Sequence, residues 1–245
     1  MKKVSGIIEV PGMGQNLTDT VLQDVKNFTG DFMTDIILLV DESTSIGYYD
    51  LEGEMSNGLV NIKNDLLGTK NADSIRVCVI RFGSSVPKDV DFVPLEKMDT
   101  SYSSYQRQTR LYETICVANN LMLQHIEAME EKNVYVNGLV IVATDGEDVG
   151  SARFYDAAKE AIRTLHGKEV DFQYICIGAD AINCAYGLGL KDDEILKVED
   201  TNDPHKVRQQ WAMASASAKT ASQKAATGSS IAGTSTAVKF NIDDD

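Results

Sequence analysis

The sequence has few cysteines and prolines and no long apolar segment, and each shortage excludes a class of protein. Its four cysteines are scattered without a CxxC pair, so neither a disulfide framework nor a zinc site is expected. The chain contains no apolar run of about 18 residues, and residues 1–15 lack the apolar stretch of a secretory signal. We therefore expect a cytoplasmic protein that does not cross a membrane.

Basic residues are also in short supply. The chain has 23 lysines and arginines against 37 aspartates and glutamates, which gives a formal net charge of −14. A surface this acidic repels the phosphate backbone of nucleic acids, so nucleic-acid binding is not expected. Such a surface suits a cationic partner instead, either a metal ion or a basic protein.

Aliphatic runs typical of buried strands alternate with helical patterns along the middle of the chain. Residues 36–40 (IILLV) form a continuous aliphatic run, as expected of a parallel strand covered on both faces. Apolar residues then recur every three or four positions, as on one face of a helix, at Leu51, Met55, Leu59, Ile62 and Leu66. Further strands are predicted at 74–82, 138–143, 170–177 and 195–198, and further helices at 109–129 and 152–165.

The alternation of strands and helices predicts the fold class. Segment 89–95 (DVDFVPL) contains Pro94, which favours an edge strand with an antiparallel partner. The remaining strands are joined through helices, which implies βαβ crossovers. We predict an α/β fold of the Rossmann-like, doubly wound type. Its sheet is mostly parallel with one antiparallel edge strand, and helices cover both faces.

The composition divides the chain into three parts. Residues 1–32 show no sustained period and are predicted to be a partly ordered leader, whereas 33–203 carry the α/β pattern. Residues 204–245 begin with a helix that contains Val207 and Trp211 and continue as an acidic tail rich in alanine, serine and glycine. Because small residues dominate from about Ser215 onward, we expect that part to pack little and to be flexible.

Polar side chains follow two predicted strands and precede one predicted helix. Asp41, Ser43 and Ser45 follow the first strand, Thr109 precedes the long helix, and Asp145 follows the strand at 138–143. In an open parallel sheet, ligands bind where the carboxyl ends of the strands meet, so these three loops can converge. Two carboxylates and three hydroxyls form an all-oxygen set, which suits Mg²⁺ or Mn²⁺ better than zinc.

Asp41-x-Ser43-x-Ser45, Thr109 and Thr144-Asp145-Gly146, in this order, resemble the metal-ion-dependent adhesion site (MIDAS) of the von Willebrand factor A (VWA) domain. The resemblance covers about residues 33–199. It implies that Ser43, Ser45 and Thr109 bind the ion directly, while Asp41 and Asp145 act through water or hydrogen bonds. It also implies that an aspartate or glutamate of a protein partner completes the coordination.

Two features lie outside this pattern. Arg107 and Gln108 precede Thr109 where the family often has glycines, and we interpret Glu147 and Asp148 as solvated charges at the rim of the site. The alanine- and serine-rich tail is similar to that of bacterial VWA proteins of the stress and tellurium-resistance type.

The function predicted from these observations is a metal-ion-dependent protein–protein interaction module, not an enzyme. The sequence has no G-x-x-x-x-G-K-[ST] phosphate loop, no complete dinucleotide fingerprint and no G-x-S-x-G nucleophile elbow. Two alternatives remain open. One is a Mg²⁺-dependent hydrolase or phosphatase on a similar sheet, and the other is a VWA scaffold that acts through its C-terminal helix.

Overall fold

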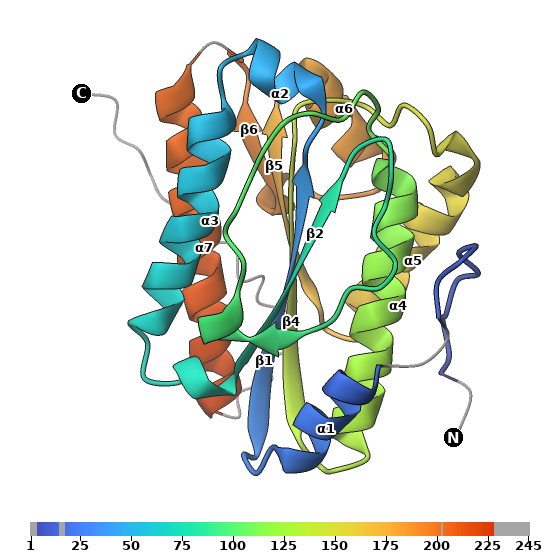
Figure 1. The fold of residues 1–245 in the computed structure, drawn as a ribbon, viewed down its shortest axis with the longest axis vertical. Coiled ribbons are helices and arrows are strands. Elements are labelled where there is room, and N and C mark those ends of the chain that lie inside the picture. The colour runs from blue at the N-terminus through green and yellow to red at the C-terminus, as the bar shows by residue number, and fades with distance from the viewer. Residues whose placement is uncertain (1–3, 15–17, 202, 228–245) are drawn as a thin grey trace.

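The computed structural model describes residues 4–14, 18–201 and 203–227 of the chain (Figure 1). Its strands are β1 (Phe32–Asp41), β2 (Ile75–Phe82), β3 (Val93–Pro94), β4 (Tyr135–Thr144), β5 (Asp171–Ile177) and β6 (Ile195–Val198). Its helices are α1 (Asp19–Asn27), α2 (Thr44–Tyr48), α3 (Glu52–Leu67), α4 (Leu111–Glu130), α5 (Tyr155–Gly167), α6 (Ala179–Gly187) and α7 (Pro204–Thr227). Short 3-10 turns lie at Ala72–Ser74, Leu95–Lys97, Ala152–Phe154 and Asp192–Glu194.

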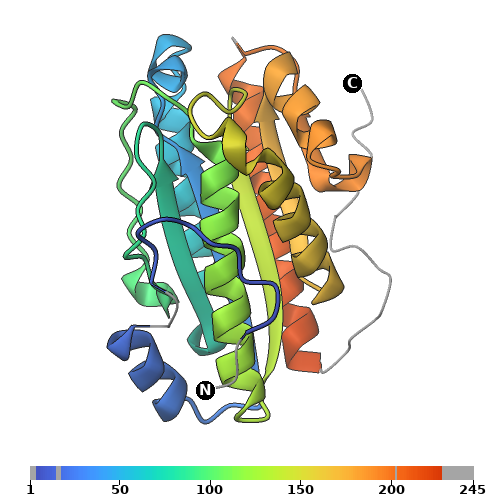
Figure 2. The same ribbon diagram turned by 90° about the vertical axis from the view of Figure 1, so that its right-hand side faces the viewer.

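The strands form one six-stranded sheet in the order β3-β2-β1-β4-β5-β6. All neighbouring pairs are parallel except β2 and β3, which pair antiparallel at the edge through Arg76–Pro94 and Val77–Val93. Helices α3 and α7 cover one face, and α4 and α5 cover the other (Figures 1 and 2). The predicted fold class, with its single antiparallel edge strand, is therefore confirmed.

Strand β1 lies at the centre of the sheet and divides its side chains between two cores. Ile36, Leu38 and Val40 pack with α3 and α7, whereas Ile37 and Leu39 pack with α4 and α5. Because both faces of the strand are covered by helices, nearly every position must be apolar. This explains the continuous aliphatic run. It also places the carboxyl end of β1 between the carboxyl ends of β2 and β4.

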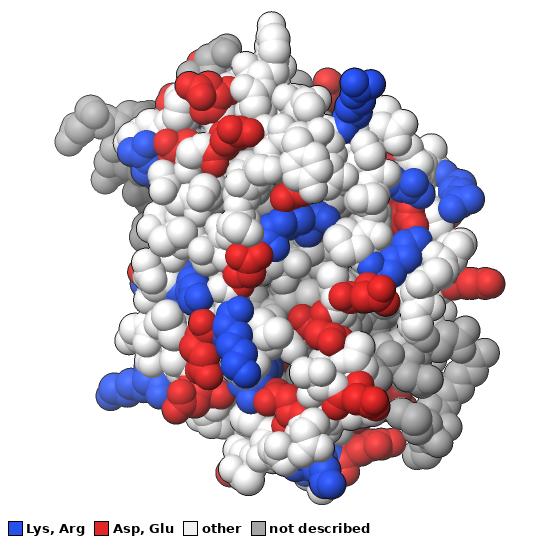
Figure 3. All heavy atoms as spheres, in the orientation of Figure 1, with Lys and Arg blue, Asp and Glu red and all other residues white. Residues whose placement is uncertain are grey.

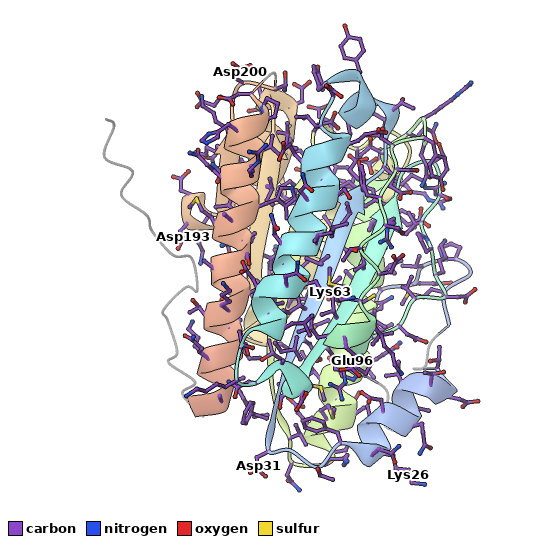
Figure 4. All side chains as sticks on the ribbon, turned by 60° about the vertical axis from the view of Figure 1, so that its left-hand side comes forward. Lys26, Asp31, Lys63, Glu96, Asp193 and Asp200 are labelled. Carbon is purple, nitrogen blue, oxygen red and sulfur yellow. The ribbon has the colours of Figure 1, made fainter. Side chains whose placement is uncertain are left out.

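Helix α7 is more deeply packed than its composition suggests. Trp211 is buried, and one stripe of the helix continues inward through Ala214, Ala218, Ala221 and Ala225, all fully buried. Figure 4 shows α7 lying beside α3 along most of its length. The expectation that the chain packs little beyond about Ser215 is therefore wrong up to Ala225, because alanine lets a helix approach its neighbours closely. The rest of the predicted flexible tail, 228–245, lies outside the described residues, and the similarity to the tellurium-resistance type stays a prediction.

The N-terminal segment is tied to α4 by side chains that bind its backbone. The Ile8 N–H donates to Asn120 Oδ1 (2.8 Å), and Asn120 Nδ2 donates to the Ile8 carbonyl (2.7 Å). Lys88 Nζ donates to the Pro11 carbonyl (2.5 Å). Val10 is buried in the core on the α4 side. The described part of the predicted leader is thus a strap across α4, followed by α1.

Replacing Asn120 by alanine is expected to release this strap without unfolding the domain. The substitution removes both hydrogen bonds to Ile8, so the Ile8 amide should exchange with deuterium at least about tenfold faster. Hydrogen exchange read by NMR measures this effect residue by residue. Asn64→Ala, at an exposed position of α3, is the control. Unchanged exchange at Ile8 in the Asn120 variant would show that the strap is held by other contacts.

The structure also shows the state of the cysteines and the character of the helices. All four cysteines are free and buried, as predicted for a chain without disulfides. Within the part of the chain that the structure describes, no helix has the length and apolar character needed to cross a membrane.

Candidate metal centre

The candidate site is built at the carboxyl edge of the sheet, around the last residue of β1. Asp41 is fully buried there, because β1 pairs with β2 on one side and β4 on the other. Its Oδ1 accepts a hydrogen bond from the Ser43 N–H (2.8 Å), and its Oδ2 accepts one from Thr144 Oγ1 (2.5 Å). Both carboxylate oxygens thus accept hydrogen bonds, one from the segment that follows β1 and one from the last residue of β4, so the Asp41 side chain is held in one orientation.

Two hydroxyls and a second carboxylate meet beside Asp41. Ser43 Oγ lies 2.9 Å from Ser45 Oγ. Ser45 Oγ donates to Asp145 Oδ1 (3.0 Å), and Ser43 Oγ lies 3.5 Å from the same oxygen. The other oxygen, Asp145 Oδ2, is buried and has no hydrogen-bond partner in the part of the chain that the structure describes. The structure therefore brings together Ser43, Ser45 and Asp145, and joins them to Asp41 through the Ser43 backbone.

Thr109 is buried in the loop that precedes α4 and is held there by backbone hydrogen bonds. Its carbonyl accepts from the Val149 N–H (2.7 Å), which ties its loop to the loop that carries Asp145. The same loop is tied to the Ser43 loop, because the Gln106 carbonyl accepts from the Thr44 N–H (2.7 Å). The three predicted loops thus converge at one edge of the sheet, the upper edge in Figure 1.

Comparison with known proteins identifies the fold family. A family model described as the von Willebrand factor type A domain matches residues 35–210, more than half of the chain. The chain belongs to the VWA family. A sequence comparison with curated proteins finds no match.

Solved structures of several other proteins share the fold at low sequence identity. The pilus adhesin SpaC from Lactobacillus rhamnosus GG aligns with a TM-score of 0.58 and 12% identity, over 80% of this chain and 31% of SpaC. The vWF domain of the type V pili tip protein Mfa5 from Porphyromonas gingivalis aligns with a TM-score of 0.55 and 10% identity, over 76% of this chain and 95% of the Mfa5 domain. Proximal thread matrix protein 1 (PTMP1) from the mussel byssus, with a zinc-occupied MIDAS motif, aligns with a TM-score of 0.51 and 15% identity, over 76% of this chain and 46% of PTMP1. This VWA chain therefore spans about a third of SpaC and under half of PTMP1.

Burial shapes the electrostatics of the site in this VWA domain. Desolvation raises the pKa of Asp41 to about 7, although the hydrogen bond from Thr144 opposes the shift, and the nearby Asp145 reinforces it. Desolvation also raises the pKa of Asp145. Two buried carboxylates close together disfavour their ionised forms, whereas a cation between them favours those forms.

The residues present fit a hard divalent cation. All the candidate donors are oxygens and include two carboxylates, and one buried carboxylate oxygen, Asp145 Oδ2, has no hydrogen-bond partner among the described residues. In the described residues, no group of three or more His, Cys, Asp or Glu side chains has a metal-binding arrangement. Any ion at this edge must therefore take hydroxyl ligands, and oxygen-only sites favour Mg²⁺ or Mn²⁺.

Three residues support the site through contacts that the sequence pattern does not reveal. Thr144 was noted only as part of the motif, yet its hydroxyl holds Asp41 Oδ2. Tyr102 donates its hydroxyl to the Asp41 carbonyl (2.6 Å), and burial together with nearby carboxylates raises its pKa. Asp148 was interpreted as a solvated rim charge, which is wrong: its Oδ1 accepts from the Tyr112 N–H (3.0 Å) at the start of α4. These contacts join residues far apart in sequence, so no local pattern predicts them.

Proposed function

We propose that this VWA domain binds Mg²⁺ or Mn²⁺ and uses the bound ion to capture a carboxylate of a protein partner. Ser43, Ser45 and Thr109 would be the direct ligands, with Asp41 and Asp145 behind them. The observation that carries the proposal is the contact of Ser43 and Ser45 with Asp145, whose second carboxylate oxygen is buried without a partner. When bound, the ion supplies a positive charge that attracts an aspartate or glutamate.

The two carboxylates differ in what they are free to do. Asp41 has both oxygens engaged by Ser43 and Thr144, so it orients the loop that carries the serine ligands. Asp145 has one unpartnered oxygen and can accept a hydrogen bond from water in the coordination shell. Because the direct ligands are neutral hydroxyls, they leave much of the ion's charge uncompensated, which strengthens its attraction for an incoming carboxylate.

The comparisons support an interaction role. The similar structures are those of a pilus adhesin, a pili tip protein and a thread matrix protein, and the last of these has a zinc-occupied MIDAS motif. The three histidines of this chain are placed elsewhere: His125 is buried against Asp35, His166 pairs with Glu194, and His205 is exposed. We therefore favour a binding module over a hydrolase. We also propose a cytoplasmic location, as expected from the sequence.

Titration calorimetry with Mg²⁺ and Mn²⁺ tests the first step of this proposal. We expect one ion per chain, and about tenfold weaker binding by Ser43→Ala because a direct ligand is lost. Ser103→Ala, which removes an exposed hydroxyl from a neighbouring loop, should bind the ion as tightly as the wild type. A wild-type protein that binds neither ion at millimolar concentration would contradict the proposal.

Metal affinity is expected to rise with pH. The pKa of Asp41 is about 7 in the metal-free protein, so protons compete with the cation below that pH. Between pH 6 and pH 8, the fraction of ionised Asp41 rises by about tenfold, and the affinity should rise by a similar factor. Calorimetry in two buffers with different ionisation enthalpies should also reveal about one proton released at pH 6. An affinity that stays constant over this range would be evidence against ionisation of Asp41 on metal binding.

A further inference from the structure

The three most exposed large apolar side chains of the described residues lie on the segments that carry the candidate metal centre. Tyr48 is 85% exposed, Tyr105 69% and Val149 58%, while the other large exposed apolar residues, Val60, Leu67 and Tyr186, are 37–43% exposed. Each of the first three lies on a different one of the three loops that form the site. We call Tyr48, Tyr105 and Val149 the apolar collar.

Each collar residue lies within four positions of a residue of the proposed site. Tyr48 lies three residues after Ser45, at the end of α2, while Tyr105 lies four residues before Thr109. Val149 lies four residues after Asp145. Figures 1 and 2 show α2 and the two other loops gathered at the same end of the molecule. In Figure 3, uncharged surface lies at this end, over α2, bordered by acidic and basic side chains.

The backbone at these positions is anchored, so the exposure does not come from loose loops. Tyr105 stands between two tied residues: the Ser104 N–H donates to Glu52 Oε1 (3.1 Å), and the Gln106 N–H donates to the Glu42 carbonyl (3.0 Å). The Val149 N–H donates to the Thr109 carbonyl (2.7 Å). The Tyr48 ring packs edge-on against Tyr49, with 5.3 Å between ring centroids. The three collar side chains are thus exposed to solvent, while hydrogen bonds or ring packing hold the segments that carry them.

Exposed aromatic and aliphatic side chains that are held in place around a charged centre are typical of binding hot spots. We propose that the partner segment carries a single acidic residue flanked by apolar residues, so that its carboxylate meets the ion while its apolar side chains cover the collar. Covering the collar excludes water from the ion and strengthens its pairing with the carboxylate. The net charge of −14 disfavours a partner rich in acidic residues, since only the ion attracts them. This inference rests on the proposed function.

A displayed library of random 12-residue peptides tests the inference. Peptides are selected on the immobilised full chain with Mg²⁺, and those eluted by EDTA are sequenced. We expect them to share one aspartate or glutamate with aromatic or aliphatic residues within about three positions. Selected peptides are then synthesised, and their affinity is measured for the wild type and for two multiple variants.

The variants separate the collar from the ion. Tyr48→Ser/Tyr105→Ser/Val149→Ser should bind Mg²⁺ as the wild type does but bind the peptides at least about tenfold more weakly. Val60→Ser/Leu67→Ser, which removes exposed apolar side chains from α3, should bind both normally. Thermal unfolding verifies that both variants are folded.

Several outcomes would overturn the inference. If the triple variant binds the peptides as tightly as the wild type, or if the selected peptides lack apolar neighbours, the collar does not contact the partner while the proposed function stands. If the wild type binds Mg²⁺ but selects no Mg²⁺-dependent peptide, the inference is also wrong. A wild type that binds neither Mg²⁺ nor Mn²⁺ would refute the proposed function itself.

Discussion

Asp41→Asn is expected to weaken Mg²⁺ binding by about 100-fold while leaving the metal-free protein at least as stable as the wild type. The substitution keeps the size of the side chain and an oxygen that can accept from the Ser43 N–H. It removes a negative charge that burial disfavours, as the raised pKa of about 7 shows. The loss of affinity and the gain of stability have the same cause, a carboxylate that is held ready for a cation.

The sign of the stability effect depends on pH. An aspartate whose pKa is raised in the folded state contributes stability at acid pH that is lost as the pH rises through about 7. Asparagine stays neutral, so the metal-free variant should gain on the order of 1–4 kcal/mol over the metal-free wild type at pH 8 and nothing at pH 4. Denaturant unfolding in EDTA at both pH values measures the difference.

Asp50→Asn is a matched control for this variant. Asp50 is exposed and has φ of 55°, a left-handed conformation that asparagine also adopts readily. Its change should alter neither Mg²⁺ affinity nor the pH dependence of stability. An Asp41→Asn protein that binds Mg²⁺ normally, or that is less stable than the wild type at pH 8 in EDTA, would contradict the role assigned to Asp41.

Gly58→Ala is expected to destabilise the fold by about 1–3 kcal/mol, although alanine normally stabilises a helix. Gly58 lies in α3 on the side that faces α7, and a methyl group there would lie 2.2 Å from Trp211 Cδ2 and 2.5 Å from Trp211 Cε2. The indole is buried between the helix and the sheet, so it cannot move aside without displacing α7. Chemical denaturation measures the loss.

Gly53→Ala in the same helix provides the control. A methyl group at position 53 would meet nothing within 4 Å, so this variant should be as stable as the wild type or slightly more stable. Trp211→Leu in the Gly58→Ala background should recover part of the loss by removing the ring that clashes, which a double-mutant cycle would quantify. If Gly53→Ala and Gly58→Ala have the same effect, the close contact of α3 with α7 does not limit stability.

The two helices also show how far the sequence could predict the fold. The stripe from Leu51 to Leu66 is predicted correctly as α3, because large apolar residues at helical spacing must be buried. Helix α7 buries alanines instead, and alanine is common on both buried and exposed helix faces. Its packing depends on the glycine at position 58, a contact between segments about 150 residues apart that no local pattern reveals.

The candidate site was predictable in its composition but not in its detailed contacts. The position of each motif at the end of a strand or the start of a helix fixed which loops would meet, and the structure brings Ser43, Ser45 and Asp145 into contact. The supporting contacts were not predictable. Tyr102 and Asp148 are bound to residues 61 and 36 positions away, and each residue alone is equally compatible with a solvated loop. The metal-binding role of the five residues remains a prediction.

Anomalous diffraction from a crystal soaked in Mn²⁺ tests that prediction most directly. We expect one strong peak where the strands end, from a manganese ion bonded to the hydroxyls of Ser43, Ser45 and Thr109, with Asp41 and Asp145 joined to the ion through water or hydrogen bonds. A soaked crystal with no peak at this edge, or with manganese bound by other residues instead, would contradict it.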